Sequence, residues 1–208
     1  MKKIIIQIIN TIIVFTTINS IGQTLDISKL GESGLIPPSG VYYKDTNNFF
    51  NQFEGRYLYQ NGNTTLEIEL VKKINQPYAM SGASFDVVIG EIKYIENNVL
   101  KVNTLSHLNS NVSFSDHVIY GFVLFDNHNK PVCSTCYSNQ KRLMASFQDP
   151  LNNNVRMDLF FKKVILPSGI ETLEMIMFDR TYKLNYETGP IDWGEHSFPV
   201  QTYVLTKI

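Results

Sequence analysis

The only two cysteines of the 208-residue chain stand close together, in the segment PVCSTCY from Pro131 to Tyr137. A redox centre of the Cys-x-x-Cys type opens a helix within a βαβ unit, whereas Pro131 precedes this pair and strands are predicted around it. A structural zinc site needs four ligands, and His128 is the nearest third candidate with no obvious fourth. Because neighbouring cysteines pair in an oxidising compartment, we predict a Cys133–Cys136 disulfide that tethers a turn, and no metal site.

Other side chains that could do chemistry are scattered. His107, His117, His128 and His196 lack the paired spacing that puts two imidazoles on one metal, so we expect them to be solvated or satisfied within the fold. Glu67, Glu69 and Glu91 alternate along predicted strands and are expected on a solvated face. The chain has neither a Gly-x-Ser-x-Gly elbow nor a glycine-rich phosphate loop. We therefore predict no catalytic residue and no cofactor, and we expect a protein that is not an enzyme.

One tract keeps an enzymatic alternative open. The segment GPIDWGEH, residues 189–196, holds the single tryptophan, Trp193, with Asp192, Glu195 and His196. Loops often carry function, so a loop-borne site here is the alternative to a non-catalytic protein.

The N-terminus has the pattern of an export signal. Lys2 and Lys3 are followed by an apolar stretch, Ile4–Ile18, and then by small residues at Ser20 and Gly22. The stretch is shorter than the roughly 20 apolar residues of a membrane span. We predict a signal peptide over residues 1–22, cleavage near Gly22, and a mature protein in the periplasm or the medium without an integral membrane span.

Cleavage would leave a mildly acidic chain. It would remove Lys2 and Lys3 from the 18 basic residues and nothing from the 19 acidic ones, for a net charge of −3. A chain without a basic cluster is not expected to bind nucleic acid. The remaining length favours one domain: an extended segment over residues 23–44 and a single β domain over residues 45–208.

Alternation of polar and apolar residues predicts strands along most of this domain. The clearest hairpin has Asn61-Gly62 between Tyr57–Tyr59 and Thr64–Lys72. Further strands are expected at 86–96, 99–105, 112–114, 117–126, 143–147, 155–164, 171–179 and 202–207. A short helix, which Asp45 or Thr46 would cap and Gly55 would end, is expected before the first strand, with its phenylalanines plugging one end of a barrel. This spacing is typical of an all-β antiparallel meander that closes into a barrel, with a β-sandwich as the alternative.

Three segments resemble a family of small exported flavobacterial proteins that is catalogued as a domain of unknown function. They are GVYYKDTNNFFNQFEGRYLYQNGNTTLEIELVKK, IGEIKYIENNVLKVNTL and FPVQTYVLTKI. Where members of the family carry Gly-x-Trp after a short helix, as lipocalin-type barrels do, this chain has Gly55-Arg56-Tyr57. The resemblance implies a calycin-like or lipocalin-like barrel, an analogy of fold rather than of a site.

The predicted function is non-catalytic binding of a small apolar ligand inside the barrel. The residues expected to contact it are Tyr57, Phe122, Leu124, Met157, Phe160, Met175, Met177 and Trp193. The alternative is an envelope or secreted module with a filled core that contacts another protein. The same apolar residues would serve as core in that case, so the sequence leaves both possibilities open.

Overall fold

The predicted hairpin forms in the computed structural model, which describes residues 22–32, 37–128, 133–178 and 196–208. Strand β3 (Gly55–Asn61) runs antiparallel to β4 (Thr64–Tyr78), with Asn61 opposite Thr64. The two-residue loop is therefore Gly62-Asn63, one residue later than the Asn61-Gly62 pattern suggests. Gly62 has a φ of 56°, which glycine adopts without the steric cost that a Cβ atom imposes.

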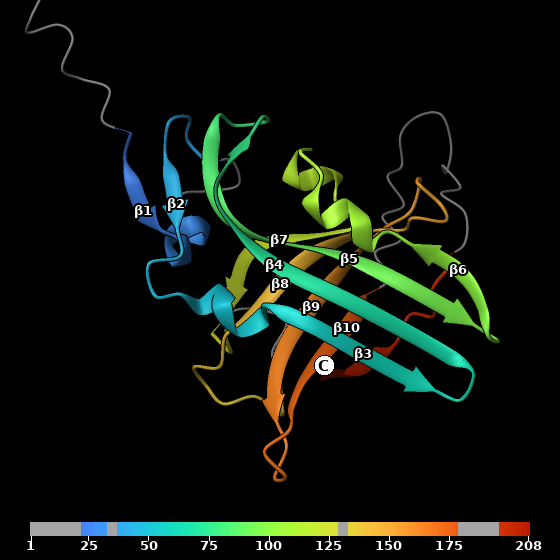
Figure 1. Cartoon of the computed structure of the whole chain (residues 1–208). Helices are drawn as coiled ribbons and strands as arrows, with labels where there is room; N and C mark the ends of the chain where they lie inside the picture. Colours follow the sequence, from blue (N-terminus) through green and yellow to red (C-terminus); the bar gives the residue numbers. More distant parts are fainter. Residues whose placement is uncertain (1–21, 33–36, 129–132, 179–195) are drawn as a thin grey trace, which may run out of the picture.

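Eight antiparallel strands close into an up-and-down barrel (Figure 1). Each pairs with the next, and the pairing of β11 with β3 completes the circle. The strands are β3, β4, β5 (Ala83–Glu96), β7 (Ile119–Phe125), β8 (Arg142–Gln148), β9 (Arg156–Ile165), β10 (Glu171–Phe178) and β11 (Thr202–Lys207). A further strand, β6 (Val99–Asn103), pairs with the last residues of β5. The prediction of an all-β, lipocalin-like barrel is confirmed, and the fold is not the alternative sandwich.

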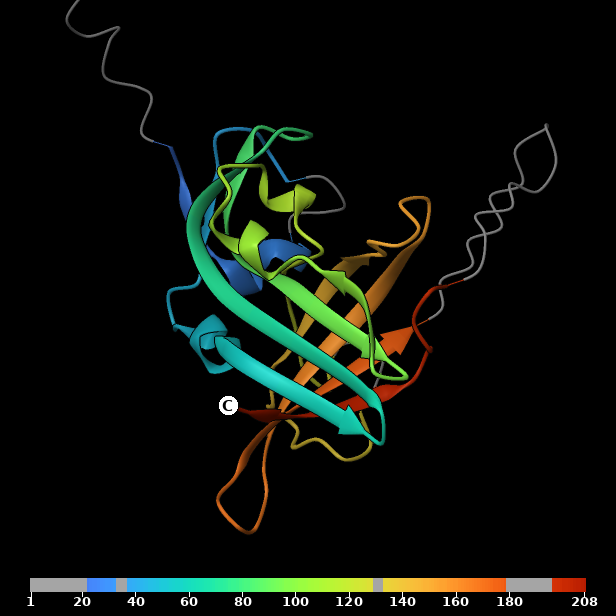
Figure 2. The same ribbon diagram turned by 45° about the vertical axis from the view of Figure 1, so that its right-hand side comes forward.

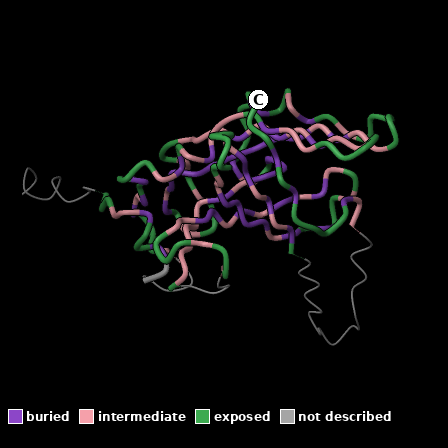
Figure 3. Tube along the Cα trace, turned by 90° about the horizontal axis from the view of Figure 1, so that it is seen from below, coloured by how far each residue is buried: buried purple, intermediate pink, exposed green. Residues whose placement is uncertain are grey.

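The register defines the inner face, because directly opposed residues of an antiparallel pair share one side of the sheet. Leu66, Ile68 and Leu70 of β4 face inward and are at most 2% exposed. Glu67 and Glu69 lie between them on the outer face, as their alternation predicts. Figure 3 shows buried residues along the centre of the molecule and exposed residues mainly at the turns.

Strand β5 is buried on both faces, which the sequence pattern did not reveal. Its outer face carries Phe85, Val87, Ile89 and Glu91, each at most 1% exposed. The elements that pack outside β5 and β7 are η1 (Ile27–Glu32), β2 (Tyr42–Lys44), η3 (Leu105–Asn109) and η4 (Phe114–Asp116) (Figure 2). The expectation that Glu91 lies on a solvated face was therefore wrong. The strand expected at 112–114 was also wrong, because Val112 and Ser113 lie in a loop and Phe114 is the first residue of η4.

The segment before the barrel is attached to β5. Strand β1 (Thr24–Asp26) pairs in parallel with β2, and β2 pairs in parallel with β5 through Tyr42 and Ser84. Residues expected to form an extended segment thus contribute two short strands and a 3-10 helix.

The helix expected before the first strand is a single 3-10 turn, η2 (Phe49–Phe53). Asn48 rather than Asp45 or Thr46 occupies the N-cap position. The Asp45 carboxylate still accepts hydrogen bonds from the backbone N–H groups of Phe49 and Phe50, the first two residues of η2. Phe50 and Phe53 are fully buried. Because η2 contacts β4, β5 and also β9 on the other side of the barrel, it closes that end.

Candidate functional site

The structure separates the residues that we predicted as ligand contacts. Five of them lie on the inner face of the barrel: Tyr57, Leu124, Met157, Met175 and Met177. Phe122 and Phe160 point outward, where Phe122 stacks on Phe85 and Phe160 contacts Phe125 and Phe178. Trp193 lies outside the described residues. So does the rest of the tract at 189–196 apart from His196.

Large side chains of the inner face contact one another. The ring centroids of Tyr59 and Tyr203 are 4.9 Å apart, and the Phe198 ring lies 4.7 Å from that of Tyr94. Burial raises the pKa of Tyr57 to about 12, and nearby Glu171 and Glu54 add to the shift. Burial and the neighbouring Glu96 likewise raise the pKa of Tyr94 to about 12. The hydroxyl groups of Tyr57 and Tyr94 are therefore neutral at physiological pH. The ring contacts show that the protein's own side chains occupy much of the described interior.

A groove of about 470 Å³ lies outside the barrel, between the end of the β4–β5 hairpin and the turn before η4. One wall comes from Gln76, Pro77, Tyr78, Ala79, Gly82 and Ala83, and the other from Asn111, Val112, Ser113 and Phe114. The rings of Tyr78 and Phe114 lie 5.9 Å apart. None of the lining residues carries a charge. The volume of the groove lies within the range of small-molecule sites.

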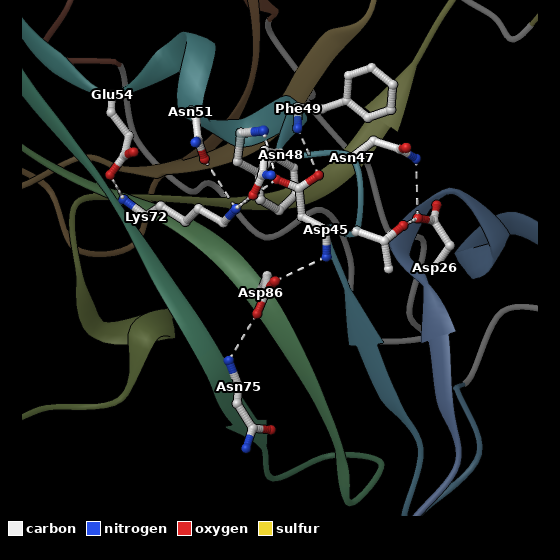
Figure 4. Close-up of polar contacts among 12 residues, drawn as sticks. Asp26, Asp45, Asn47, Asn48, Phe49, Asn51, Glu54, Lys72, Asn75 and Asp86 are labelled. Carbon is white, nitrogen blue, oxygen red and sulfur yellow. Dashed lines mark hydrogen bonds and ion pairs between the residues drawn. The ribbon is translucent and has the colours of Figure 1, made fainter.

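A buried carboxylate positions the first wall (Figure 4). Asp86 accepts hydrogen bonds from the Tyr42 hydroxyl and from the backbone N–H groups of Asp45 and Asn75. Asn75 has a φ of 51° and lies where the register between β4 and β5 shifts. The irregularity held by Asp86 thus comes directly before Gln76, the first residue of the groove.

A second buried acid links this region to the barrel end. The Asp45 carboxylate binds Lys72 Nζ at 2.9 Å in addition to the two N–H groups of η2. Lys72 Nζ also donates to the side-chain oxygens of Asn48 and Asn51 (Figure 4). The cation and the carboxylate therefore both have partners, which buried charges require. This network fixes structure and leaves no free group for chemistry.

A buried acid and histidine hold the second wall. His117 Nδ1 lies 2.7 Å from Glu91 Oε1, and the two side chains are 3% and 1% exposed. The Thr104 hydroxyl bonds to both backbone groups of Ile92 on β5. These contacts fix both ends of the segment between β6 and β7, which carries Asn111–Phe114. His117 is satisfied within the fold, as expected of an isolated histidine.

Sequence reasoning missed the groove because its residues lie on three separate segments. One signal was present: Pro77 lies between the strands predicted at Thr64–Lys72 and 86–96, and proline is confined to strand edges or irregular positions. The register is consistent with an edge position for Pro77, because the part of β4 beyond Leu70 has no partner in β3. In the described ranges, no three His, Cys, Asp or Glu side chains gather closely enough to hold a metal ion.

The two cysteines form the predicted disulfide. Asn127 also holds the loop: its side-chain amide donates to the carbonyl groups of Cys133 and Cys136, and its oxygen accepts from the Cys133 N–H. The disulfide is therefore one of several bonds that close a short turn.

Replacing both cysteines with serine is expected to leave a folded protein whose melting temperature falls by a few degrees. A closed loop this short contributes about 2 kcal/mol at most in the chain-entropy model, and the Asn127 bonds remain. Differential scanning calorimetry of the double variant measures the change. An unfolded variant, or free thiols in wild-type protein purified without reductant, would contradict the interpretation.

The fold and the site together define a class: an up-and-down β-barrel with a plugged end and an uncharged groove on its outer side. The described residues include no helix long and apolar enough to cross a bilayer. The chain belongs to DUF6705, a family of unknown function whose model matches residues 1–208. No curated protein matches the chain significantly, and no solved structure does.

Proposed function

We propose that this protein is a non-catalytic binding module that holds a small, uncharged and largely apolar ligand in the outer groove. The observation that carries the proposal is the lining itself, in which Tyr78 and Phe114 offer apolar surface while Gln76 and Asn111 offer amide groups. A few polar groups on a mostly apolar surface are typical of ligand sites. Buried polar contacts hold both walls, so the groove is formed before a ligand arrives.

Native mass spectrometry of protein purified from its own host tests the proposal. We expect a small adduct on the wild-type protein. Val112→Glu should remove it, because this side chain is 48% exposed in the groove and the change places a charge among uncharged groups. Val99→Glu on β6 is the matched control, since Val99 is similarly exposed and lies outside the groove. A wild-type protein without adduct would contradict the proposal and favour contact with an envelope protein.

The barrel interior is the second candidate site. Met157, Met175 and Met177 lie on neighbouring inner-face positions of β9 and β10, and methionine side chains adapt to irregular shapes. An adduct that survives Val112→Glu but disappears in Met177→Trp, which would fill the interior, would place the ligand there instead.

We also propose that the protein is exported, on the pattern of its first 22 residues and in keeping with its disulfide. The expected mature chain begins at Gln23. Intact-mass measurement of the periplasmic and medium fractions reports this directly, and full-length protein in the membrane fraction would contradict it.

A further inference from the structure

The outer face of β8 and β9 carries a buried cation, Arg142, that forms no ion pair with the described residues. Lys162 of β9 lies on the same face as Arg142, and Lys141 comes directly before Arg142 in the sequence. Lys141 pairs with the Asp126 carboxylate at 2.8 Å, and Lys162 pairs with the Glu174 carboxylate at 2.6 Å. Arg142 is 3% exposed, and no described carboxylate lies within ion-pair distance of it. Its one hydrogen bond within the described ranges runs from Nη2 to the backbone carbonyl of Asp126 at 2.9 Å.

The guanidinium of Arg142 also keeps an unused donor. Its Nε is buried and has no hydrogen-bond partner. Buried arginines are almost always paired, because a charge removed from water without compensation costs several kcal/mol. The nearby Asp126 carboxylate acts on this charge electrostatically, but its only bond to Arg142 among the described residues is through the backbone carbonyl. The unused N–H is therefore what an incoming carboxylate would satisfy, since arginine binds carboxylates through strong, charge-assisted hydrogen bonds.

Apolar surface lies next to this charge. The guanidinium carbon is 6.0 Å from the centre of the Phe160 ring. Phe125 and Phe178 contact Phe160 edge-on, with centroid distances of 5.7 and 5.2 Å. Phe178 is 37% exposed, so this aromatic cluster reaches the solvent on one side.

We propose that Arg142 and these three phenylalanines form a binding site for a small carboxylate with an apolar body, such as an alkyl carboxylate. The carboxylate accepts a hydrogen bond from Arg142 Nε, and the apolar body lies against the phenylalanine rings. The site shares no residue with the outer groove, whose lining is uncharged, and does not depend on the groove binding a ligand.

Isothermal titration with octanoate, and with octanol as its uncharged analogue, tests this site. We expect octanoate to bind at least tenfold more tightly than octanol, because a hydrogen bond between charged groups contributes that much. Arg142→Gln should lose at least tenfold in octanoate affinity. Arg156→Gln is the matched control, because Arg156 is an exposed arginine of the neighbouring strand β9, and this variant should bind as the wild type does.

Other results would overturn the proposal. These are equal affinity for octanoate and octanol, unchanged octanoate binding by Arg142→Gln, or loss of octanoate binding in the groove variant Val112→Glu. If Arg142→Gln does not fold, Phe178→Ala replaces it, because that side chain is partly exposed. An unchanged octanoate affinity in Phe178→Ala would then count against the site, and a weaker one would support it.

Discussion

Replacing Asp45 with alanine is expected to lower the free energy of unfolding by about 4 kcal/mol, because breaking a buried ion pair from one side leaves an uncompensated charge. Lys72 would lose its only carboxylate within 4 Å among the described residues. The N–H groups of Phe49 and Phe50 would lose their acceptor as well. Chemical denaturation monitored by circular dichroism measures the loss.

A double variant separates the charge from the cap. Adding Lys72→Met to Asp45→Ala removes the orphaned cation, so part of the lost stability should return. Asp116→Ala is the control, because Asp116 is exposed and should change stability by less than about 0.5 kcal/mol. An Asp45→Ala variant within about 1 kcal/mol of the wild type would show that the network contributes little.

Gly121→Ala is expected to be the second most damaging change, with a loss of about 3 kcal/mol. A Cβ atom at Gly121 would lie 2.6 Å from the Met144 carbonyl oxygen and 2.8 Å from the Ala145 Cβ. Because backbone atoms and a Cβ cannot rotate away, β7 and β8 would have to separate. Thermal and chemical denaturation both report the effect.

Gly90→Ala provides the comparison. Its Cβ atom would come closest, at 2.5 Å, to the end of the Leu70 side chain, which can adopt another rotamer. The next contacts, with the Glu69 carbonyl at 3.1 Å and the Ile119 Cβ at 3.3 Å, need only small shifts. We expect a loss of about 1 to 2 kcal/mol. A loss equal to or greater than that of Gly121→Ala would contradict this account of the packing.

Local patterns predicted the barrel, but not what covers its outer side. The alternation of Leu66, Ile68 and Leu70 with acidic residues identified one buried face of β4 correctly. In β5 the same alternation suggested a solvated face for Glu91. This prediction failed because the 3-10 turns that cover the outer face of β5 are too short to show a periodic pattern in the sequence. What packs against a strand depends on distant segments, which a local pattern does not contain.

The predicted ligand residues illustrate a second limit. Phe122 and Leu124 are two residues apart and would share a face in a regular strand. The register between β7 and β8 shifts after Gly121, and such an irregularity moves the following residues to the other face. Met157 and Phe160, three residues apart in β9, face opposite sides in any case. The groove and the Arg142 cluster depend on such registers, so the sequence did not predict them.

The seam that closes the barrel joins the two barrel strands that lie farthest apart along the chain. Strand β11 is in register with β3 only at Leu58–Thr206 and Tyr57–Lys207, whereas β4 and β5 pair from Thr65–Ile95 to Tyr78–Ala83. Contacts between distant segments form late because closing a long loop costs entropy, and elements with few contacts open first in the native state. We therefore expect transient opening between β3 and β11 to be the route by which solvent, or a molecule of suitable size, reaches the interior.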